Sequence, residues 1–249
     1  MDRPQWPTGN ADAEDRLNTV LADGYVPRAR RRGSGGGADG DFLTFLVMRT
    51  RFFDGAVIRA LRSGVEQIVI LGAGYDARAL RFHTPGVTFY EVDHPATQAD
   101  KLRRLHDVDA PLDGIVFVTA DFIDPQWGDR LAEAGHDSSR PTLFTCEGVL
   151  RYLPEHAFHG LLRTTAARAA KGSELAVSIS TREGAPGERE VEREQALADS
   201  GEAVLTVPPA ATAIEWLTEA GWRVVSNSHP GPQPNTRGRL LVRARPSAP

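Results

Sequence analysis

The segment with the clearest chemical potential is a glycine-rich loop, Gly72-Ala73-Gly74-Tyr75-Asp76-Ala77, which follows a short apolar run. The loop satisfies the G-x-G-x-x-A pattern, and Asp93 lies about 20 residues further on, where an acid that binds ribose hydroxyls belongs. The two glycines let the backbone approach a ligand closely, because a Cβ would collide with it. The pattern therefore predicts a site for an adenosine-containing cofactor without deciding which one.

The acid inside the loop, Asp76, separates two cofactors. A dinucleotide such as NAD places its pyrophosphate at the helix N-terminus, where Asp76 would add an unfavourable negative charge. S-adenosylmethionine has no phosphate and carries an ammonium and a sulfonium. The Tyr-Lys pair of short-chain dehydrogenases, four residues apart, is also missing, since Thr97 precedes Lys101 and Ala167 precedes Lys171. The loop favours S-adenosylmethionine, and an NAD-dependent oxidoreductase is the less favoured alternative.

The elements that must position this loop alternate between strand and helix. Apolar runs at the expected length of buried strands occupy residues 67–71, 87–92, 115–119, 142–146 and 174–179. Helical stretches separate them, for example residues 95–106 and 154–170, each of which begins at a proline. This alternation predicts right-handed βαβ units in a doubly wound, mostly parallel sheet. After a helix at 211–220, strands at 222–225 and 240–242 follow each other without a helix, which predicts an antiparallel hairpin at a sheet edge and seven strands in total.

The N-terminal quarter has a different pattern. Helical spacing predicts a short helix at residues 11–21 and a longer one at 41–61, with Asp41 as its N-cap. Between them, the arginine- and glycine-rich residues 28–40 favour a flexible surface loop. A basic arm for nucleic acid would need aromatic or base-reading residues nearby, and none is present. We expect residues 1–64 to form a helical cap or lid and residues 65–249 to form the cofactor-binding domain, as one structural unit.

Composition narrows the classes of function. Hydrophobic residues make up 41% and charged residues 25% of the 249 residues, which is typical of a globular protein. The net charge of −4 predicts neither a nucleic-acid nor a membrane partner, and no apolar run approaches the roughly 20 residues of a membrane span. A single cysteine, Cys146, excludes a disulfide framework and a multi-cysteine zinc site. We expect a cytoplasmic protein with no metal; a homodimer stays open.

Five sequence blocks resemble, in the same order, the motifs of the leucine carboxyl methyltransferase family, which includes bacterial O-methyltransferases of natural-product pathways such as the tetracenomycin type. The blocks are Arg49-Thr50-Arg51-Phe52-Phe53-Asp54, Leu71-Gly72-Ala73-Gly74-Tyr75-Asp76-Ala77-Arg78-Ala79-Leu80-Arg81, Glu91-Val92-Asp93-His94-Pro95 with Lys101, Thr119-Ala120-Asp121-Phe122 with Trp127, and Glu147-Gly148-Val149-Leu150-Arg151-Tyr152-Leu153-Pro154. Trp216 and Gly221-Trp222 extend the match. The resemblance implies a Rossmann-like S-adenosylmethionine-dependent methyltransferase fold and an O-methyltransferase activity on a small hydroxyl or carboxyl acceptor of secondary metabolism.

The resemblance also implies a role for each cofactor-binding residue. Arg49 would hold the cofactor carboxylate, Asp93 the ribose and Asp121 the adenine amino group. The remaining members of the set are Gly72, Ala73 and Gly74 along the methionine part, His94 beside Asp93, Phe122 against the adenine ring, and Glu147 at the carboxyl end of the fourth strand, where such sheets bind ligands. Three of these roles have a simpler alternative: a surface ion pair of Arg49 with Asp54, and helix capping at the strand ends by Asp121 and Glu147.

The acceptor side is less defined by the sequence. Methyl transfer needs alignment and exclusion of water, and a hydroxyl acceptor also benefits from a general base. The catalytic residue is unknown; the candidates are Tyr152, His156 and Arg151. His156 and His159 are expected to be solvated helix residues, and Cys146 a packing residue.

Two departures from relatives concern the acceptor: Arg151 replaces an uncharged residue, and residues 179–211 are short and charged. Arg151 either binds an anionic acceptor or pairs with Glu155 or solvent. The alternative function is a methyltransferase-fold protein that keeps the cofactor site but performs binding or other chemistry.

Overall fold

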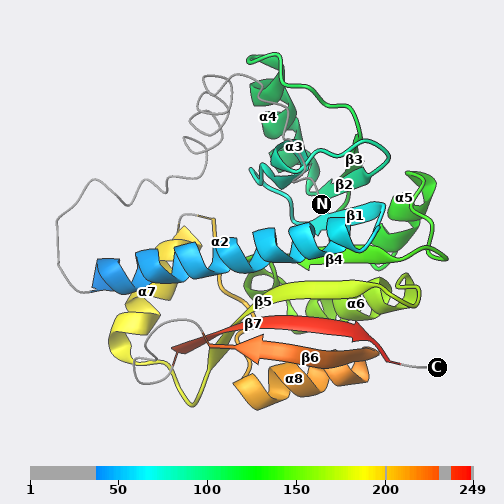
Figure 1. Cartoon of the computed structure of the whole chain (residues 1–249). Helices are drawn as coiled ribbons and strands as arrows, with labels where there is room; N and C mark the ends of the chain where they lie inside the picture. Colours follow the sequence, from blue (N-terminus) through cyan, green and yellow to red (C-terminus); the bar gives the residue numbers. More distant parts are fainter. Residues whose placement is uncertain (1–37, 200, 230–236, 248–249) are drawn as a thin grey trace.

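The computed structural model describes residues 38–199, 201–229 and 237–247. Their strands form one seven-stranded sheet in the order β3-β2-β1-β4-β5-β7-β6, in which the first five are parallel and β7 runs antiparallel to both of its neighbours (Figure 1). The strands are β1 (Gln67–Leu71), β2 (Thr88–Asp93), β3 (Ile115–Thr119), β4 (Thr142–Cys146), β5 (Glu174–Arg182), β6 (Trp222–Ser228) and β7 (Arg237–Pro246). The expected doubly wound sheet is confirmed.

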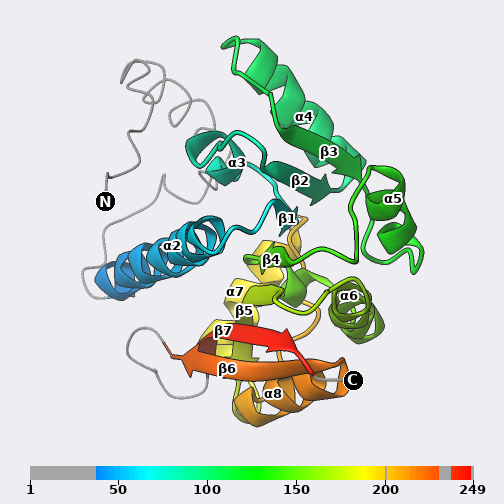
Figure 2. The ribbon, with the colours of Figure 1, turned by 45° about the vertical axis from the view of Figure 1, so that its right-hand side comes forward.

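Helices cover both faces of the sheet, as Figure 2 shows, with α2 and α3 on one face and α5, α6 and α8 on the other. The helical elements are α2 (Ala38–Arg62), α3 (Arg78–Arg81), α4 (Pro95–His106), α5 (Trp127–Glu133), the short 3-10 helix η2 (Leu150–Tyr152), α6 (Glu155–Ala167), α7 (Glu188–Asp199) and α8 (Ala210–Glu219). No helix among these residues combines the length and apolar character that a membrane span requires.

The central strand β1 shows why continuous apolar runs predicted this architecture. All five of its residues are buried. Val69 and Leu71 face the core beneath α5, α6 and α8, whereas Ile68 and Ile70 face the core beneath α2 and α3. A strand covered on both faces needs apolar residues at every position, because its side chains alternate between two dry layers.

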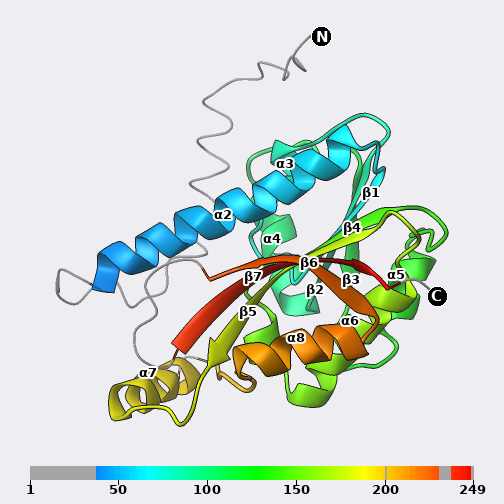
Figure 3. The ribbon, with the colours of Figure 1, turned by 60° about the horizontal axis from the view of Figure 1, so that its bottom comes forward.

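Helix α2 is the one N-terminal element within the described residues. It begins at Ala38, so Asp41 lies inside the helix and is not its N-cap, which corrects the expectation from sequence. Its second half packs Phe53 and Val57 against the sheet. In its first half, the ring of Phe45 lies 4.3 Å from the guanidinium carbon of Arg239 on β7, and this half lies at the same end of the molecule as α7 (Figure 3).

The C-terminal hairpin is confirmed, with one detail that the sequence left open. The last strand, β7, inserts between β5 and β6, so that β6 forms the sheet edge. Trp222 anchors this edge, because its fully buried indole Nε1 donates a 3.0 Å hydrogen bond to the carbonyl of Leu162 on α6. The predicted helix at 11–21 and most of the loop at 28–40 lie outside the described residues, so the division at residue 64 stays a prediction.

Candidate functional site

The glycine loop leaves β1 at the carboxyl edge of the sheet. Gly72 and Gly74 have φ values of 64° and 45°, in the left-handed region that disfavours other residues. The amides of Gly72 and Ala73 both donate to the carbonyl of Val92, at 2.8 and 3.2 Å, which ties the loop to the end of β2. A Cβ at Gly72 would lie 2.2 Å from Val149 Cγ2. The loop therefore requires glycine for both conformation and space.

Asp93 receives the loop at the end of β2. Its two carboxylate oxygens accept from the backbone amides of Gly74 and of His94, the latter at 2.7 Å. A carboxylate offers about four lone-pair sites, so Asp93 keeps the capacity to accept from ribose hydroxyls. His94 is the N-cap of α4, where its Nδ1 accepts from the amide of Ala96 at 3.3 Å. The contact that this structure shows for the His94 side chain is therefore that of a helix cap.

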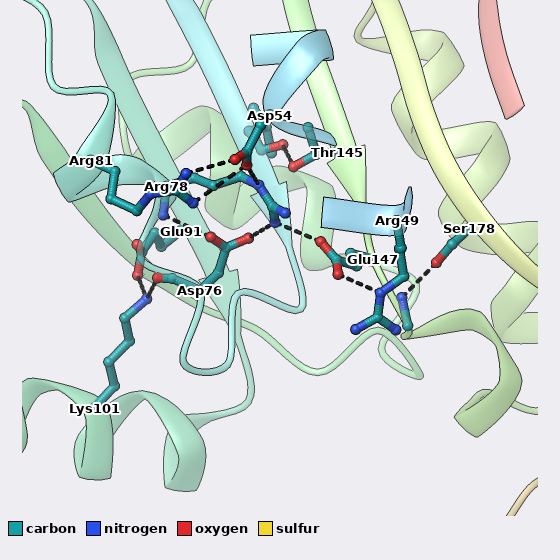
Figure 4. A network of polar contacts seen from close by, with 12 residues as sticks. Arg49, Asp54, Asp76, Arg78, Arg81, Glu91, Lys101, Thr145, Glu147 and Ser178 are labelled. Carbon is teal, nitrogen blue, oxygen red and sulfur yellow. Dashed lines mark hydrogen bonds and ion pairs between the residues drawn. The ribbon is translucent and has the colours of Figure 1, made fainter. Parts of the chain in front are cut away.

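A buried arginine that sequence reasoning had assigned no role, Arg78 on α3, connects three segments of this site (Figure 4). Its Nε lies 2.8 Å from Asp54 Oδ1 on α2, and its Nη1 lies 2.6 Å from both Asp76 Oδ2 and Glu147 Oε2. The pKa of Arg78 is raised: burial alone would lower it, but these three carboxylates outweigh the loss of solvation. The guanidinium is thus locked in its charged form at the centre of the network.

Arg49 joins the same network from α2. Its Nε lies 2.6 Å from Glu147 Oε1, and both side chains are largely buried. The simpler alternative, a surface pair of Arg49 with Asp54, is not what forms, because Asp54 pairs with Arg78 and with Arg81, at 2.8 and 2.6 Å. Glu147 is likewise no capping residue, since its two oxygens bridge Arg49 and Arg78.

A buried ion pair, Lys101 with Glu91, contacts the backbone of the glycine loop at Asp76. Lys101 Nζ lies 2.6 Å from Glu91 Oε2 and donates to the carbonyl of Asp76, also at 2.6 Å. The side chains of Lys101 and Glu91 are 1% and 2% exposed. Burial raises the pKa of Glu91 to about 7 against the opposing effect of Lys101. The pair fixes the backbone of Asp76 while Arg78 fixes its carboxylate.

The segment expected to meet the adenine follows β3. Asp121 is exposed, and its Oδ1 accepts from the amide of Ile123 at 2.9 Å, which leaves Oδ2 for other partners. It is a turn residue and not the expected helix cap, because the N-cap of α5 is Gln126. Phe122 is buried, with its ring edge-on to Trp127 at 5.2 Å between ring centroids. Ile123, next in the chain, is 53% exposed. Contact of Phe122 with adenine therefore remains a prediction that only a small part of its ring could satisfy.

Arg151 and Tyr152 lie in η2, which follows the turn at Gly148. The carbonyl of Arg151 accepts from the amides of Leu205 and Thr206, at 2.8 and 3.2 Å, so residues 203–208 run alongside η2. The guanidinium carbon of Arg151 lies 5.3 Å from the Tyr152 ring. Its Nε and Nη2 are buried and donate no hydrogen bond within the described part of the chain, and the expected alternative partner, Glu155, is not among its contacts there.

The remaining candidates have structural explanations. His156 is exposed on α6, whereas His159 is half-buried with its ring 4.5 Å from that of Trp216 on α8. Cys146 is fully buried, and burial raises the pKa of its thiol, which suits a packing residue. His156 and Cys146 therefore match the expectations of a solvated helix residue and a packing residue. The expectation of a solvated residue is wrong for His159, because its ring packs against Trp216.

The donor set fits the amino-acid end of S-adenosylmethionine. Arginine and carboxylate side chains converge beside the glycine loop, as a zwitterion requires, and a Cβ at Gly74 would have no neighbour closer than 3.9 Å. A pyrophosphate fits less well, because Asp76 and Glu147 both lie at the start of α3. This helix has only four residues and thus supplies little dipole. The antiparallel β7, which lies between β5 and β6, also departs from the strand order 3-2-1-4-5-6 of dinucleotide-binding sheets.

Sequence reasoning missed Arg78 and Asp54 as site residues. The one local signal was the spacing of Asp76 and Arg78, whose side chains pair two positions apart. The partners of Arg78 on α2 and after β4 are 24 and 69 residues away in the chain. No spacing rule for a single helix or strand connects residues over such separations.

Comparisons with known proteins agree with this geometry. The family model described as leucine carboxyl methyltransferase matches residues 12–166. A protein of Frankia alni is 35% identical over 72% of this chain and 61% of its own length, and one of Mycolicibacterium paratuberculosis is 33% identical over 86% of this chain and 67% of its own length. Both are named "Putative S-adenosyl-L-methionine-dependent methyltransferase". The chain spans about half to two thirds of the length of the curated relatives it matches.

Solved structures share the fold at low sequence identity. A methyltransferase-like structure from Thermobifida fusca superposes with a TM-score of 0.63 at 15% identity, over 96% of this chain and 90% of that one. The magnesium protoporphyrin IX methyltransferase of Synechocystis, with bound S-adenosylhomocysteine, gives 0.54 at 15% identity, over 95% of both chains. The Rossmann-like methyltransferase fold expected from the sequence is confirmed. By its motifs, its sheet and its match to the family model, the chain belongs to the leucine carboxyl methyltransferase family.

Proposed function

We propose that this protein is an S-adenosylmethionine-dependent O-methyltransferase whose acceptor is a small molecule with an anionic group. The observation that carries the cofactor part is the convergence of Arg49, Glu147 and the glycine loop at the carboxyl edge of the sheet, with Asp93 beside them. The names of the relatives support the same cofactor. The cofactor-binding set would be Arg49, Gly72, Ala73, Gly74, Asp93, His94, Asp121, Phe122 and Glu147.

The acceptor part rests on Arg151. Burying polar nitrogens without hydrogen bonds is costly, especially on a charged group, so the unsatisfied Nε and Nη2 favour a ligand that supplies oxygen acceptors. A guanidinium binds carboxylates and other oxyanions through directed, paired hydrogen bonds. Tyr152, stacked against Arg151, would add an apolar surface to the same place. A carboxylic acid or an acidic phenol therefore matches η2 better than a neutral alcohol does.

Methyl transfer requires the protein mainly to align the acceptor with the methyl group. When bound, S-adenosylmethionine would supply a methyl group activated by its sulfonium: a C–O bond to the acceptor would form as the C–S bond breaks, and S-adenosylhomocysteine would leave. Arg151 would fix the anionic acceptor, and the residues around Glu147 and Asp93 would fix the donor, so that the reacting atoms meet in one orientation. A carboxylate or phenolate oxygen needs no general base. This agrees with the exposed His156 and the packed His159.

Calorimetric titration tests the cofactor. S-adenosylmethionine and S-adenosylhomocysteine should bind, and NAD should not compete with them. Tight binding of NAD without a response to S-adenosylhomocysteine would refute the proposal.

A second experiment tests the reaction itself. The protein is incubated with methyl-labelled S-adenosylmethionine and a panel of small carboxylic acids, phenols and neutral alcohols, and labelled products are identified by mass spectrometry. Labelled methyl esters or ethers of the acidic compounds are expected. Cofactor binding with no labelled product from any class would instead support the alternative, a methyltransferase-fold protein that binds the cofactor for another purpose.

A further inference from the structure

Three carboxylates from three separate segments converge on the guanidinium of Arg78. Asp54 comes from α2, Asp76 from the glycine loop and Glu147 from the turn after β4, at distances of 2.6 to 2.8 Å (Figure 4). The Arg78 side chain is 7% exposed, and its partners are 13–18% exposed. Its guanidinium carbon also lies 5.3 Å from the ring of Phe53. Contacts to carboxylates and to an aromatic ring hold this guanidinium in one orientation.

The consequence for Glu147 is that its carboxylate is held at both ends. Oε2 faces Arg78 Nη1 and Oε1 faces Arg49 Nε, each at 2.6 Å. Arg49 is thereby fixed as well, because Glu147 is a shared partner. The backbone amide of Gly148, next in the chain, donates to Ser178 Oγ on β5 at 2.8 Å, which limits movement of the turn itself.

The consequence for Asp76 is similar. One oxygen accepts from the backbone amide of Arg78 at 2.7 Å and the other lies 2.6 Å from Arg78 Nη1, so the carboxylate closes onto the start of α3. Without Arg78, Asp54, Asp76 and Glu147 would lose their shared buried partner. Repulsion among them would then move Glu147 and Asp76 away from their present positions.

We propose that Arg78 is a positioning residue that sets the geometry of the methionine end of the cofactor site by acting through Glu147 and Asp76. This inference rests on the proposed function, because it concerns the cofactor named there. Arg78 has little influence on the adenosine end, since Asp93 is held by the amides of Gly74 and His94. The two ends of the cofactor should therefore respond differently when Arg78 is replaced.

The test compares two ligands and two arginines of the same helix. S-adenosylhomocysteine carries the amino-acid end, whereas 5′-methylthioadenosine lacks it and keeps the adenosine. Arg78→Gln should weaken S-adenosylhomocysteine at least about tenfold in calorimetric titration and change methylthioadenosine by less than about threefold. Arg81→Gln is the matched control, because Arg81 also lies on α3 and contacts Asp54 from a more exposed position. Both ligands should bind this control as they bind the wild type.

Each other outcome has a defined meaning. Equal weakening of both ligands by Arg78→Gln would show a merely structural role, and unchanged affinity for S-adenosylhomocysteine would show no role; either result overturns the inference. If the glutamine variant does not fold, Arg78→Lys replaces it, because an ammonium keeps the charge but cannot hold several carboxylates in the fixed geometry of a guanidinium. The same selective loss is expected there, and its absence is equally decisive. A wild type that binds neither ligand would refute the proposed function itself.

Discussion

Two halves of the carboxyl edge of the sheet differ in how they satisfy their charges. At the proposed cofactor end, Arg78 pairs with Asp76 and Glu147, and Asp93 accepts hydrogen bonds from the backbone amides of Gly74 and His94. The proposed acceptor end, to which we assign η2, α7 and residues 203–208, leaves two buried nitrogens of Arg151 without hydrogen bonds among the described residues. We therefore expect the cofactor to bind to side chains that are already paired, and the acceptor to supply the missing hydrogen bonds of Arg151.

The attachment of the two halves differs in the same sense. The glycine loop is tied directly to β2 and α4, and through Arg78 to α2. Helix α7 is tied to the end of β5 through Arg182, whose guanidinium pairs with Glu190 and Glu194, and its Val191 is 50% exposed. A site that always binds the same cofactor can be rigid. A site that must fit a particular acceptor benefits from loops and helices that can vary without disturbing the sheet.

The largest effect is expected from breaking the ion pair beneath the cofactor end. Lys101→Met would leave Glu91 buried without its partner, and breaking a buried pair costs about 3–5 kcal/mol of the free energy of unfolding. The pKa of Glu91, already raised to about 7, would rise further without Lys101. A raised pKa contributes stability at low pH that is lost as the pH rises through it, so the defect should grow from acidic to neutral pH.

Urea denaturation at several pH values measures this effect. Lys171→Met is the matched control, because Lys171 is exposed, and its unfolding midpoint should equal that of the wild type. Similar midpoints for the Lys101 and Lys171 variants would mean that the stability of the fold does not depend on the buried ion pair at the cofactor end.

The second effect concerns ligand affinity at the cofactor end. Asp93→Ala would remove acceptors for two ribose hydroxyls, each charge-assisted bond being worth about 1.5–3 kcal/mol. It would also release the amide of Gly74. Affinity for S-adenosylhomocysteine should fall at least about tenfold while the circular dichroism spectrum stays native. Unchanged affinity would show that the ribose is held elsewhere.

At the acceptor end, the same kind of change should act on the substrate and spare the fold. Arg151→Gln should raise the KM for an acidic acceptor by about tenfold or more and leave the affinity for S-adenosylhomocysteine unchanged. The free energy of unfolding should not fall, because two of the replaced nitrogens, the buried Nε and Nη2, make no hydrogen bonds in the described structure. If KM and cofactor affinity both keep their wild-type values, Arg151 is not part of the acceptor site and the contrast between the two ends fails.

The smallest effect is expected from His156. Its side chain is exposed on α6, so His156→Ala should leave kcat within about twofold of the wild type at each pH and keep the same ionisations in the pH profile. Loss of an ionisation from the pH profile, together with a tenfold lower kcat, would instead identify a general base. The acceptor would then be a hydroxyl compound, and Arg151 alone would no longer explain which acceptor is used.

The sequence by itself determined the elements and the cofactor loop. The strands at 67–71, 115–119 and 142–146 match their predicted bounds. For β1 the reason is that a strand buried on both faces is built from a continuous apolar run, whereas β3 lies at the sheet edge and was recognisable from residues that favour strands. The helix at 95–106 also matches, because Pro95 fixes its start. The helix expected after the glycine loop is the four-residue α3, whereas η2 was not predicted, since three residues show no periodicity. The glycine loop was recognisable because conformation and lack of space at Gly72 exclude other residues.

Only the tertiary structure decided how the charges pair. Asp54 lies five residues from Arg49 in the chain, yet Arg49 pairs with Glu147, and Asp54 pairs with Arg78. Arg151 stands four residues before Glu155, the spacing of a helical ion pair, but η2 and α6 are separate elements and Arg151 is left with unbonded nitrogens. Local patterns encode which residues are buried and which turns are tight. The partner of a charge depends on which elements the folded sheet brings within a few ångströms, and sequence spacing does not contain that distance.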